Sequence, residues 1–333
     1  MKRVCLPYNE PMYSTYHWMS CAGIPAKQNP TSDNWYYNNT VNWRCTRRFL
    51  NGYTSPELNL GTGITLDLPF LNVLCVNMRL IRRCPIEIIK TMLDDGFYVV
   101  FHGVDDFYVE GKSWYKEHHF SHDGLIIGYD DEKEVFSIAA YDQRWIFTVF
   151  ETPQQGFLEA ISSTCSVGDY GELQAVKAKE NEIVELDLEM IYNSLSDYLT
   201  ADLSQYPMSC PDIAWGVPVY DFICLYLDKL GDGSIPYERR DNRILRFIWE
   251  HKKCMLGRIN AVEIKCRWDN KLSESYKSVV EKADKARFIY SKFSIKKSSS
   301  SLEGIQTLLL EIKNEEVSIL KSLYNNLKGY VDD

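Results

Sequence analysis

The sequence predicts an α+β protein in which an antiparallel sheet precedes a mostly helical half. Four short runs rich in Val, Ile, Phe and Tyr lie close together between residues 97 and 151, and such runs separated by tight turns normally pair as an antiparallel meander. Beyond about residue 180, apolar residues recur at three- and four-residue spacing, which is typical of helices. We therefore expect two domains, over residues 1–175 and 176–333.

The residues before the predicted sheet are expected to form a few helices and one strand. The opening segment is rich in aromatic residues, Asn and Pro, and predicts short helices over 14–22 and 39–50, the second ended by Asn51-Gly52. The run GTGITLDLPFLNVLCVN predicts a turn followed by a strand. Pro85 begins a helix that ends at Gly96, because glycine readily adopts the left-handed conformation of a helix stop.

The strands of the predicted sheet and the later helices follow from the pattern of apolar residues. The four strand runs are FYVVFHGV, HDGLIIGYD, EVFSIAAYD and WIFTVFE. A helix over 153–163 is expected next to the sheet. Further helices are predicted over 184–198, 217–230, 239–262, 273–293 and 302–327, and KKSSSS at 296–301 predicts a loop between the last two.

Composition narrows the classes of function. The formal net charge of −9 argues against a nucleic-acid binder, because phosphate surfaces are bound by clustered Lys and Arg. No stretch reaches the roughly 18 apolar residues that span a bilayer, and the first residues turn polar where a signal peptide would be apolar. We therefore expect a cytoplasmic protein without membrane contact. None of the ten cysteines falls in a CxxC pair, so we expect them to be reduced and mostly buried, without a zinc or redox role.

The densest group of reactive side chains is HHFSH, residues 118–122, directly before a predicted strand. A histidine at the mouth of a strand is held by the sheet and still reaches solvent, as a general base must. Asp142 ends the next predicted strand, so a tight turn at 130–133 would place it at the same end of the sheet as His122, where it would orient the imidazole. The alternatives are an ordinary hydrogen-bonded loop with Asp142 as a turn cap, and a weak metal site.

A His–Asp pair of this kind needs a nucleophile, and a cysteine thiolate is its natural companion. Cys21, in HWMSCAGI, stands among small and aromatic residues like those around active thiols, and is the candidate. Pro25 argues against a long helix starting there. The alternative is a chain with no catalytic cysteine, and the other cysteines before the sheet, which are second choices or core residues, are Cys5, Cys45, Cys75 and Cys84.

Residues 103–142, GVDDFYVEGKSWYKEHHFSHDGLIIGYDDEKEVFSIAAYD, resemble the N-terminal domain of the BtrH family of butirosin biosynthesis. The upstream LNLGTGITLDLPF is similar to that family's Gly-rich segment. Residues 237–259, YERRDNRILRFIWEHKKCMLGRI, resemble motifs in the helical half of related biosynthetic-cluster proteins. The resemblance covers most of the chain. The family's His-Cys-Gly-Ser opening is not present in this sequence, and its spacing puts Asn39 at the position of that cysteine.

The resemblance implies a papain-like cysteine-protease fold with a central antiparallel sheet and a helical C-terminal half that covers the active site. It implies acyl transfer from a thioester on the phosphopantetheine of an acyl or peptidyl carrier protein to a small amine, as in amide synthases that join thiotemplated chains to a diamine. No cofactor or metal of the enzyme's own is implied. His122 and Asp142 match the family's His and Asp, and Cys21 would complete the triad through a different N-terminal layout.

Four residues are expected to contact substrate, although ordinary packing is the default for the aromatic ones: Trp18, Trp114, His119 and Tyr141. A homodimer is left open. Two other functions compete with acyl transfer. One is a binding or self-resistance protein that keeps the fold without a nucleophile, and the other is a hydrolase, either a peptidase or a thioesterase.

Overall fold

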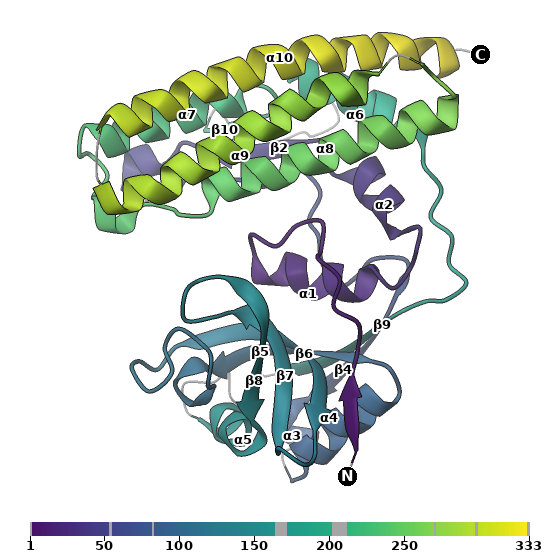
Figure 1. Cartoon of the computed structure of the whole chain (residues 1–333), viewed down its shortest axis with the longest axis vertical. Coiled ribbons are helices and arrows are strands. Elements are labelled where there is room, and N and C mark those ends of the chain that lie inside the picture. The colour runs from purple at the N-terminus through teal and green to yellow at the C-terminus, as the bar shows by residue number, and fades with distance from the viewer. Residues whose placement is uncertain are drawn as a thin grey trace. The chain divides into compact units, whose positions relative to one another are not determined.

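The structure is a computed structural model that describes residues 2–52, 55–81, 83–163, 172–201, 212–269, 271–296 and 299–331. Contacts divide the chain into two compact units. Unit 1 comprises Met1–Ser32 and Ile64–Ile183, and unit 2 comprises Asp33–Gly63 and Val184–Asp333. The predicted domains, 1–175 and 176–333, are each one stretch of chain, whereas each unit is built from two. Residues 33–63 thus belong with the helical half, and the chain passes between the units three times (Figure 1).

Unit 1 is built on a seven-stranded antiparallel sheet. The strand order is β4-β9-β5-β6-β7-β8, and β1 also pairs with β6. The four-stranded meander predicted from the sequence is confirmed as β5 to β8, and the predicted earlier strand as β4. The strand β9, which lies between β4 and β5, was not predicted. The bounds are β1 (Arg3–Cys5), β4 (Leu71–Asn77), β5 (Tyr98–Asp105), β6 (Ser121–Asp130), β7 (Val135–Tyr141), β8 (Phe147–Pro153) and β9 (Glu172–Ala178).

Both faces of this sheet are covered. Helices α4 (Pro85–Asp94) and α5 (Gln154–Ser162) pack on one face, where Phe101 and Phe157 belong to a single hydrophobic cluster. Helix α1 (His17–Ala26) packs against β6 and β9, and Figure 1 shows it on the other side of the sheet from α4 and the short α3 (Met78–Ile81). The predicted helices at 85–96 and 153–163 are confirmed. The one predicted over 14–22 begins three residues later and runs on through Pro25.

Unit 2 is mostly helical and carries a small antiparallel sheet in the order β10-β2-β3. The five helices predicted beyond residue 180 are confirmed, with ends shifted by a few residues. The loop predicted over 296–301 is wrong at its described positions, because residue 296 still belongs to the fourth of these helices and residues 299–301 to the last, while residues 297 and 298 lie outside the described ranges. The bounds are α2 (Ser32–Asn39), β2 (Trp43–Thr46), β3 (Asn59–Leu60), α6 (Leu188–Thr200), β10 (Ile213–Trp215), α7 (Val219–Gly231), α8 (Ile244–Cys266), α9 (Leu272–Lys296) and α10 (Ser299–Val331).

The helix predicted over residues 39–50 is wrong. Helix α2 ends where that helix was expected to begin, and β2 follows it. The reason is the alternation in β2, since Trp43 and Cys45 are fully buried while Arg44 between them is exposed. A period of two residues buries one side of a strand, and a helix would have turned these side chains to different faces.

A buried ion pair joins all five helices of unit 2 between α6 and α10. Lys252 Nζ on α8 lies 2.9 Å from Glu316 Oε1 on α10, and both side chains are 0% exposed. Glu316 also accepts hydrogen bonds from the hydroxyls of Tyr198 on α6, Tyr220 on α7 and Tyr276 on α9. Four helices therefore each contribute one side chain to a carboxylate carried by the fifth, and these bonds compensate the cost of burying the charges. No helix in the described ranges is long and apolar enough to cross a lipid bilayer.

Candidate active site

The histidine at the start of β6 is paired with a carboxylate from the end of β5. His122 Nδ1 lies 2.9 Å from Asp106 Oδ2. The two strands are antiparallel with Val104 opposite His122, so the residues that follow β5 lie beside the start of β6. Asp106 is 1% exposed, whereas the His122 side chain is 21% exposed. The imidazole is thus fixed at one nitrogen by a buried carboxylate and still reaches solvent.

A buried lysine lies behind this carboxylate. Lys112 Nζ is 3.3 Å from Asp106 Oδ1 and its side chain is 0% exposed. The same ammonium donates a hydrogen bond of 2.9 Å to the backbone oxygen of Asp123. The ammonium and the carboxylate compensate each other's charge in a place that excludes water. Lys112 therefore forms an ion pair with the carboxylate oxygen of Asp106 that His122 does not use.

A second histidine, His17 at the first position of α1, contacts His122. The ring centroids are 4.2 Å apart at an interplanar angle of 64°, and the Tyr141 ring lies 4.9 Å from His17 on another side. Burial, assisted by the charge of Lys112, lowers the pKa of His17 to about 2. Its Nε2 is buried and has no hydrogen-bond partner among the described residues. His17 is thus a neutral imidazole beside the oriented one.

The predicted nucleophile, Cys21, lies on α1 four residues after His17 and therefore on the same face of the helix. It is 2% exposed, and burial raises the pKa of its thiol to about 12. The thiolate is the reactive form of cysteine, so this environment holds Cys21 in its unreactive form. The exposed thiols of the described residues are Cys5, Cys75 and Cys84.

Asp142, predicted to orient His122, is bonded elsewhere, and the carboxylate on His122 is that of Asp106. Asp142 Oδ1 accepts from the backbone N–H of Arg144 at 2.8 Å and of Ile146 at 3.0 Å, and Oδ2 accepts from the Arg144 guanidinium at 2.7 and 2.9 Å. The ladder between β6 and β7 ends at Leu125 and Ala139, so it does not hold Asp142 opposite His122. Asp142 instead caps the turn between β7 and β8, the alternative considered above.

Two of the four predicted substrate-contacting residues, Tyr141 and Trp114, lie near His122. The Tyr141 hydroxyl donates to the backbone oxygen of Ser14 at 2.6 Å, which fixes the chain just before α1. The Trp114 ring lies 6.3 Å from Phe120, whose ring lies 5.2 Å from His122. These contacts bring both Tyr141 and Trp114 into the surroundings of His122.

The other two predicted substrate residues contact neighbours other than His122 and Asp106. His119 Nδ1 is 2.8 Å from Asp105 Oδ2, and its ring stacks on Phe107 at 4.3 Å. Trp18 is 44% exposed and stacks on Tyr16 at 4.5 Å. Trp18 follows His17 directly in the chain, so its backbone lies at the N-terminal end of α1.

Sequence reasoning missed Asp106, Lys112 and His17. A signal for the first was present, because Asp105-Asp106 ends one predicted strand shortly before HHFSH begins the next. In an antiparallel pair these acids and histidines must meet, and the structure joins Asp105 to His119 and Asp106 to His122. No comparable signal identified Lys112 or His17, whose roles depend on which segments pack together.

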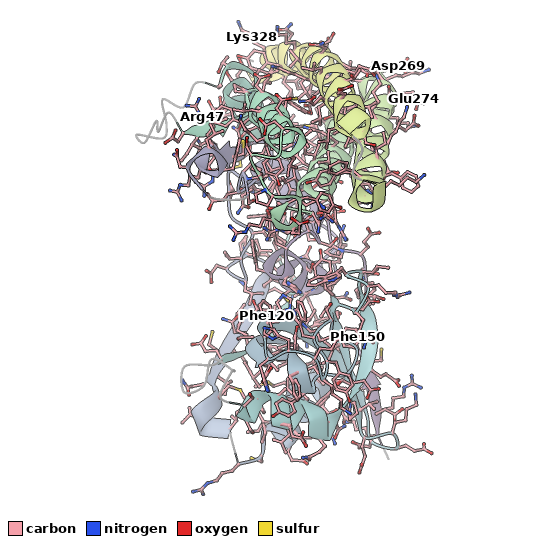
Figure 2. The ribbon with its side chains drawn as sticks, turned by 90° about the vertical axis from the view of Figure 1, so that its left-hand side faces the viewer. Arg47, Phe120, Phe150, Asp269, Glu274 and Lys328 are labelled. Atoms are coloured by element: carbon pink, nitrogen blue, oxygen red, sulfur yellow. The ribbon has the colours of Figure 1, made fainter. Side chains whose placement is uncertain are left out.

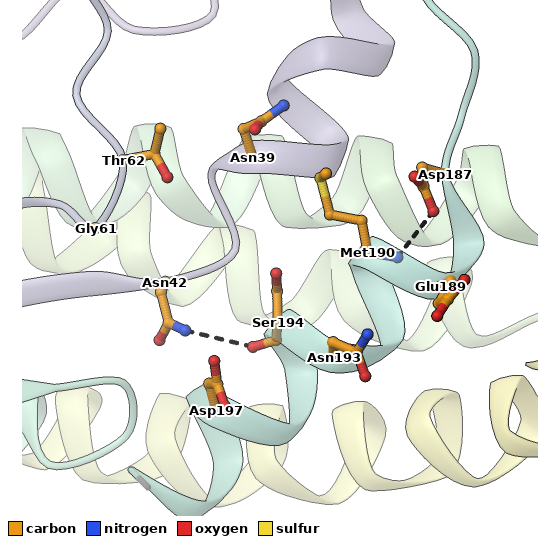
Figure 3. Close-up of a pocket in the computed structure, with 10 residues that line it drawn as sticks. All are labelled: Asn39, Asn42, Gly61, Thr62, Asp187, Glu189, Met190, Asn193, Ser194 and Asp197. Carbon is orange, nitrogen blue, oxygen red and sulfur yellow. Dashed lines mark hydrogen bonds between the residues drawn. The ribbon is translucent and has the colours of Figure 1, made fainter. Parts of the chain in front are cut away.

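A separate hollow lies in unit 2, with a volume of about 340 Å³. Three of its described lining residues, Asp187, Glu189 and Asp197, carry carboxylates and none carries a basic group. Figure 3 shows that one Asp187 oxygen is occupied by the backbone N–H of Met190, at 2.8 Å, so this carboxylate caps α6. The sequence did not predict a site here, and the remaining lining residues are Asn39, Asn42, Gly61, Thr62, Met190, Asn193 and Ser194.

The groups around His122 are suited to proton transfer. Within the described ranges, no group of three or more His, Cys, Asp or Glu side chains is arranged to hold a metal ion. Comparison of the sequence with protein-family models gives no match, and no curated protein matches it either.

Proposed function

We propose that this chain is an enzyme that forms an amide by transferring an acyl group from a carrier-protein thioester to a small amine, with His122 as the general base. The observation that carries the proposal is the 2.9 Å bond between the buried Asp106 and Nδ1 of His122, whose side chain is still 21% exposed. A base held in this way has a fixed tautomer and direction. The resemblance of residues 103–142 to the BtrH family supplies the substrate class and the papain-like fold.

The proposed reaction needs two proton transfers, one from the amine to His122 and one from His122 to the leaving thiolate. The amine nitrogen attacks the thioester carbonyl carbon while His122 Nε2 takes a proton from it, and Asp106 stabilises the resulting imidazolium through Nδ1. Collapse of the tetrahedral intermediate breaks the C–S bond. The proton on His122 then passes to the departing thiolate, so that the products are the amide and the free carrier thiol.

We infer direct attack by the amine rather than an acyl-enzyme on Cys21. Raising the thiol pKa from 9.0 to about 12 corresponds to about 4 kcal/mol for forming the thiolate. A thioester is already activated, so no covalent step is required before the amine attacks. Cys21 is therefore a core residue of α1 in this mechanism, and the triad predicted from the sequence is reduced to a dyad of His122 and Asp106.

The test is product analysis with an acyl thioester and a panel of amines. Amide in excess of free acid is expected from the unchanged protein. His122→Ala and Asp106→Asn are expected to lower kcat/KM about 10²- to 10⁴-fold, the usual contribution of a general base. Cys21→Ala is expected to stay within about fivefold, because a core Cys→Ala change removes little volume.

Each competing function has its own outcome in this test. Loss of activity in a folded Cys21→Ala variant would establish the acyl-enzyme route. Free acid formed at the same rate with or without amine would identify a hydrolase. Binding of the thioester without any turnover would identify a binding protein on the same fold, which the buried state of Cys21 favours as the second candidate.

A further inference from the structure

The surface beside His122 is built from large apolar side chains on separate segments. Trp145, in the turn between β7 and β8, is 56% exposed, its neighbour Ile146 is 48% exposed, and Phe120, just before β6, is 41% exposed. The Trp114 ring lies between them, 6.2 Å from Trp145 and 6.3 Å from Phe120. Figure 2 shows Phe120 in unit 1 with its side chain drawn. We call Trp114, Phe120 and Trp145 the aromatic platform.

The turn that carries Trp145 is strained and strongly held. Trp145 has a φ of +59°, a conformation that costs a bulky residue about 1–3 kcal/mol. Asp142 stabilises the turn because its carboxylate accepts from the N–H groups of Arg144 and Ile146, on either side of Trp145. The Trp145 N–H itself donates to the Asp142 backbone oxygen at 2.9 Å. The turn thus holds an exposed tryptophan in a backbone conformation that is unfavourable for its side chain.

The loop that carries Trp114 is hydrogen-bonded to the turn that carries Trp145, and it also contacts the pair of His122 and Asp106. Gln143 N–H donates to the Gly111 oxygen at 3.0 Å, and Ser113 Oγ donates to the Asp142 oxygen at 2.8 Å. Gly111 has a φ of +97°, and a Cβ there would lie 2.3 Å from the Phe150 ring. The next residue is Lys112, which contacts Asp106. The position of the platform is therefore linked to the position of the catalytic pair.

An exposed apolar patch of this kind marks a binding surface, and its continuity with His122 identifies the occupant. The Phe120 ring lies 5.2 Å from the His122 ring, so a molecule on the platform has one end at the general base. Indole faces also attract cations, but the platform's side chains and the neighbouring Ile146 are apolar, and the carboxylate of the same turn, Asp142, is already paired with the Arg144 guanidinium at 2.7 Å, so a cationic amine finds no free counter-charge in this turn. The occupant is therefore apolar.

We propose that the aromatic platform is the subsite for the acyl chain, and that the enzyme takes thioesters of extended apolar acyl groups. The chain lies across Trp145 and Trp114, and its carbonyl end reaches His122 past Phe120. This inference rests on the proposed function, because the general base fixes the end of the chain that reacts. It also gives Asp142 a role, as the positioning residue that holds Trp145.

The first test compares acetyl, hexanoyl and decanoyl thioesters of N-acetylcysteamine with one amine. We expect kcat/KM to rise about two- to fourfold for each methylene that is buried. Trp145→Gly accepts the positive φ without strain and should flatten this series while leaving the KM of the amine unchanged. Leu80→Ala, which removes an apolar side chain of unit 1 that is 81% exposed, is the control and should keep the full series.

The second test separates the subsite from the reaction. The unreactive amide analogue of the decanoyl thioester, N-acetyl-N′-decanoylethylenediamine, is titrated calorimetrically into the His122→Ala protein and into the same protein with Trp145→Gly added. Binding that weakens about tenfold or more in the second protein supports the subsite even if no variant turns over thioester. Turnover that is the same for all three acyl groups, or a Trp145→Gly effect on the amine alone, overturns the subsite and leaves the proposed function standing.

Discussion

His17 and His122 contact each other but stand in different surroundings. Burial and the nearby Lys112 keep His17 neutral, whereas His122 has a carboxylate at Nδ1 and reaches solvent. In the proposed reaction the proton released by the amine is held by His122, beside the carboxylate of Asp106. His17 restricts the space on one side of this base and does not compete with it for the proton.

The environment of His17 predicts a dependence of stability on pH. Its pKa is about 2 in the folded chain against a usual value of 6.5. As the pH falls below 6.5, the unfolded chain takes up a proton that the folded chain does not, so the free energy of unfolding decreases by about 1.4 kcal/mol per pH unit. Urea titrations at pH 7 and pH 5 measure how far the free energy of unfolding falls between these two pH values. This fall should be about 2 kcal/mol smaller for His17→Gln than for the unchanged chain. Equal decreases would show that His17 takes up its proton in the folded state.

At the scale of residues, the sequence identified one member of the His122–Asp106 pair. His122 was found because a histidine before a strand is a simple pattern. Its partner was not, because the choice between Asp106 and Asp142 depends on where each ladder stops and on the register shift between Phe101 and Val104. The burial of Cys21 depends on the packing of α1 against β6 and β9, and no local pattern reveals such a contact.

At the scale of elements, the attachment of β1 to β6 depends on one glycine. A Cβ at Gly128 would lie 2.4 Å from the Val4 oxygen, so alanine must push β1 away from its partner strand. We expect Gly128→Ala to lower the free energy of unfolding by about 1–3 kcal/mol, measured by urea titration. Gly63→Ala, where a Cβ meets nothing within 4 Å, should change it by less than about 0.5 kcal/mol. Similar values for the two variants would contradict the close approach of β1.

The elements that the sequence predicted are those with strong local patterns, and the missed ones lack them. The meander has dense β-branched and aromatic runs, and the C-terminal helices have long apolar periods. Strand β9, ELQAVKA, is rich in alanine and charge and therefore shows no strand propensity; its pairing with β4 and β5 decides its conformation. The papain-like fold stays a prediction, because it depends on the three-dimensional arrangement of the elements and not on the pattern within any one of them.

At the scale of the whole molecule, the single carboxylate shared by five helices should control the cooperativity of unit 2. Glu316→Gln leaves the buried Lys252 without its counter-charge, and we expect a loss of about 3 kcal/mol in the free energy of unfolding. Glu311→Gln removes an exposed partner of Lys282, 3.8 Å away, and should cost less than about 1 kcal/mol. A small effect of Glu316→Gln in urea titrations would show that packing alone holds the helices.

The division of the chain predicts which fragments fold. A protein of residues 176–333 lacks Trp43, whose ring stacks on His251 at 4.5 Å and lies 3.8 Å from Lys252 Nζ. We expect it to show no cooperative urea transition by circular dichroism. Residues 33–63 joined to 184–333 by a short Gly-Ser linker should unfold in one transition, and the linker needs little length because Thr62 and Asp187 line the same hollow. A cooperative transition in the shorter fragment would contradict this assignment.

The threefold passage of the chain between the units also has a consequence for biosynthesis. Residues 33–63 leave the ribosome roughly 120 residues before the α6–α10 segment that completes their unit, which is on the order of 10 s of translation. During that interval the nascent chain carries Trp43 and its neighbours without their final partners, while residues 64–183 of unit 1 are synthesised. Slow elongation would therefore prolong the time during which the apolar side chains of residues 33–63 are exposed to solvent. Newly made copies of this protein should depend on chaperones until the last helix has left the ribosome.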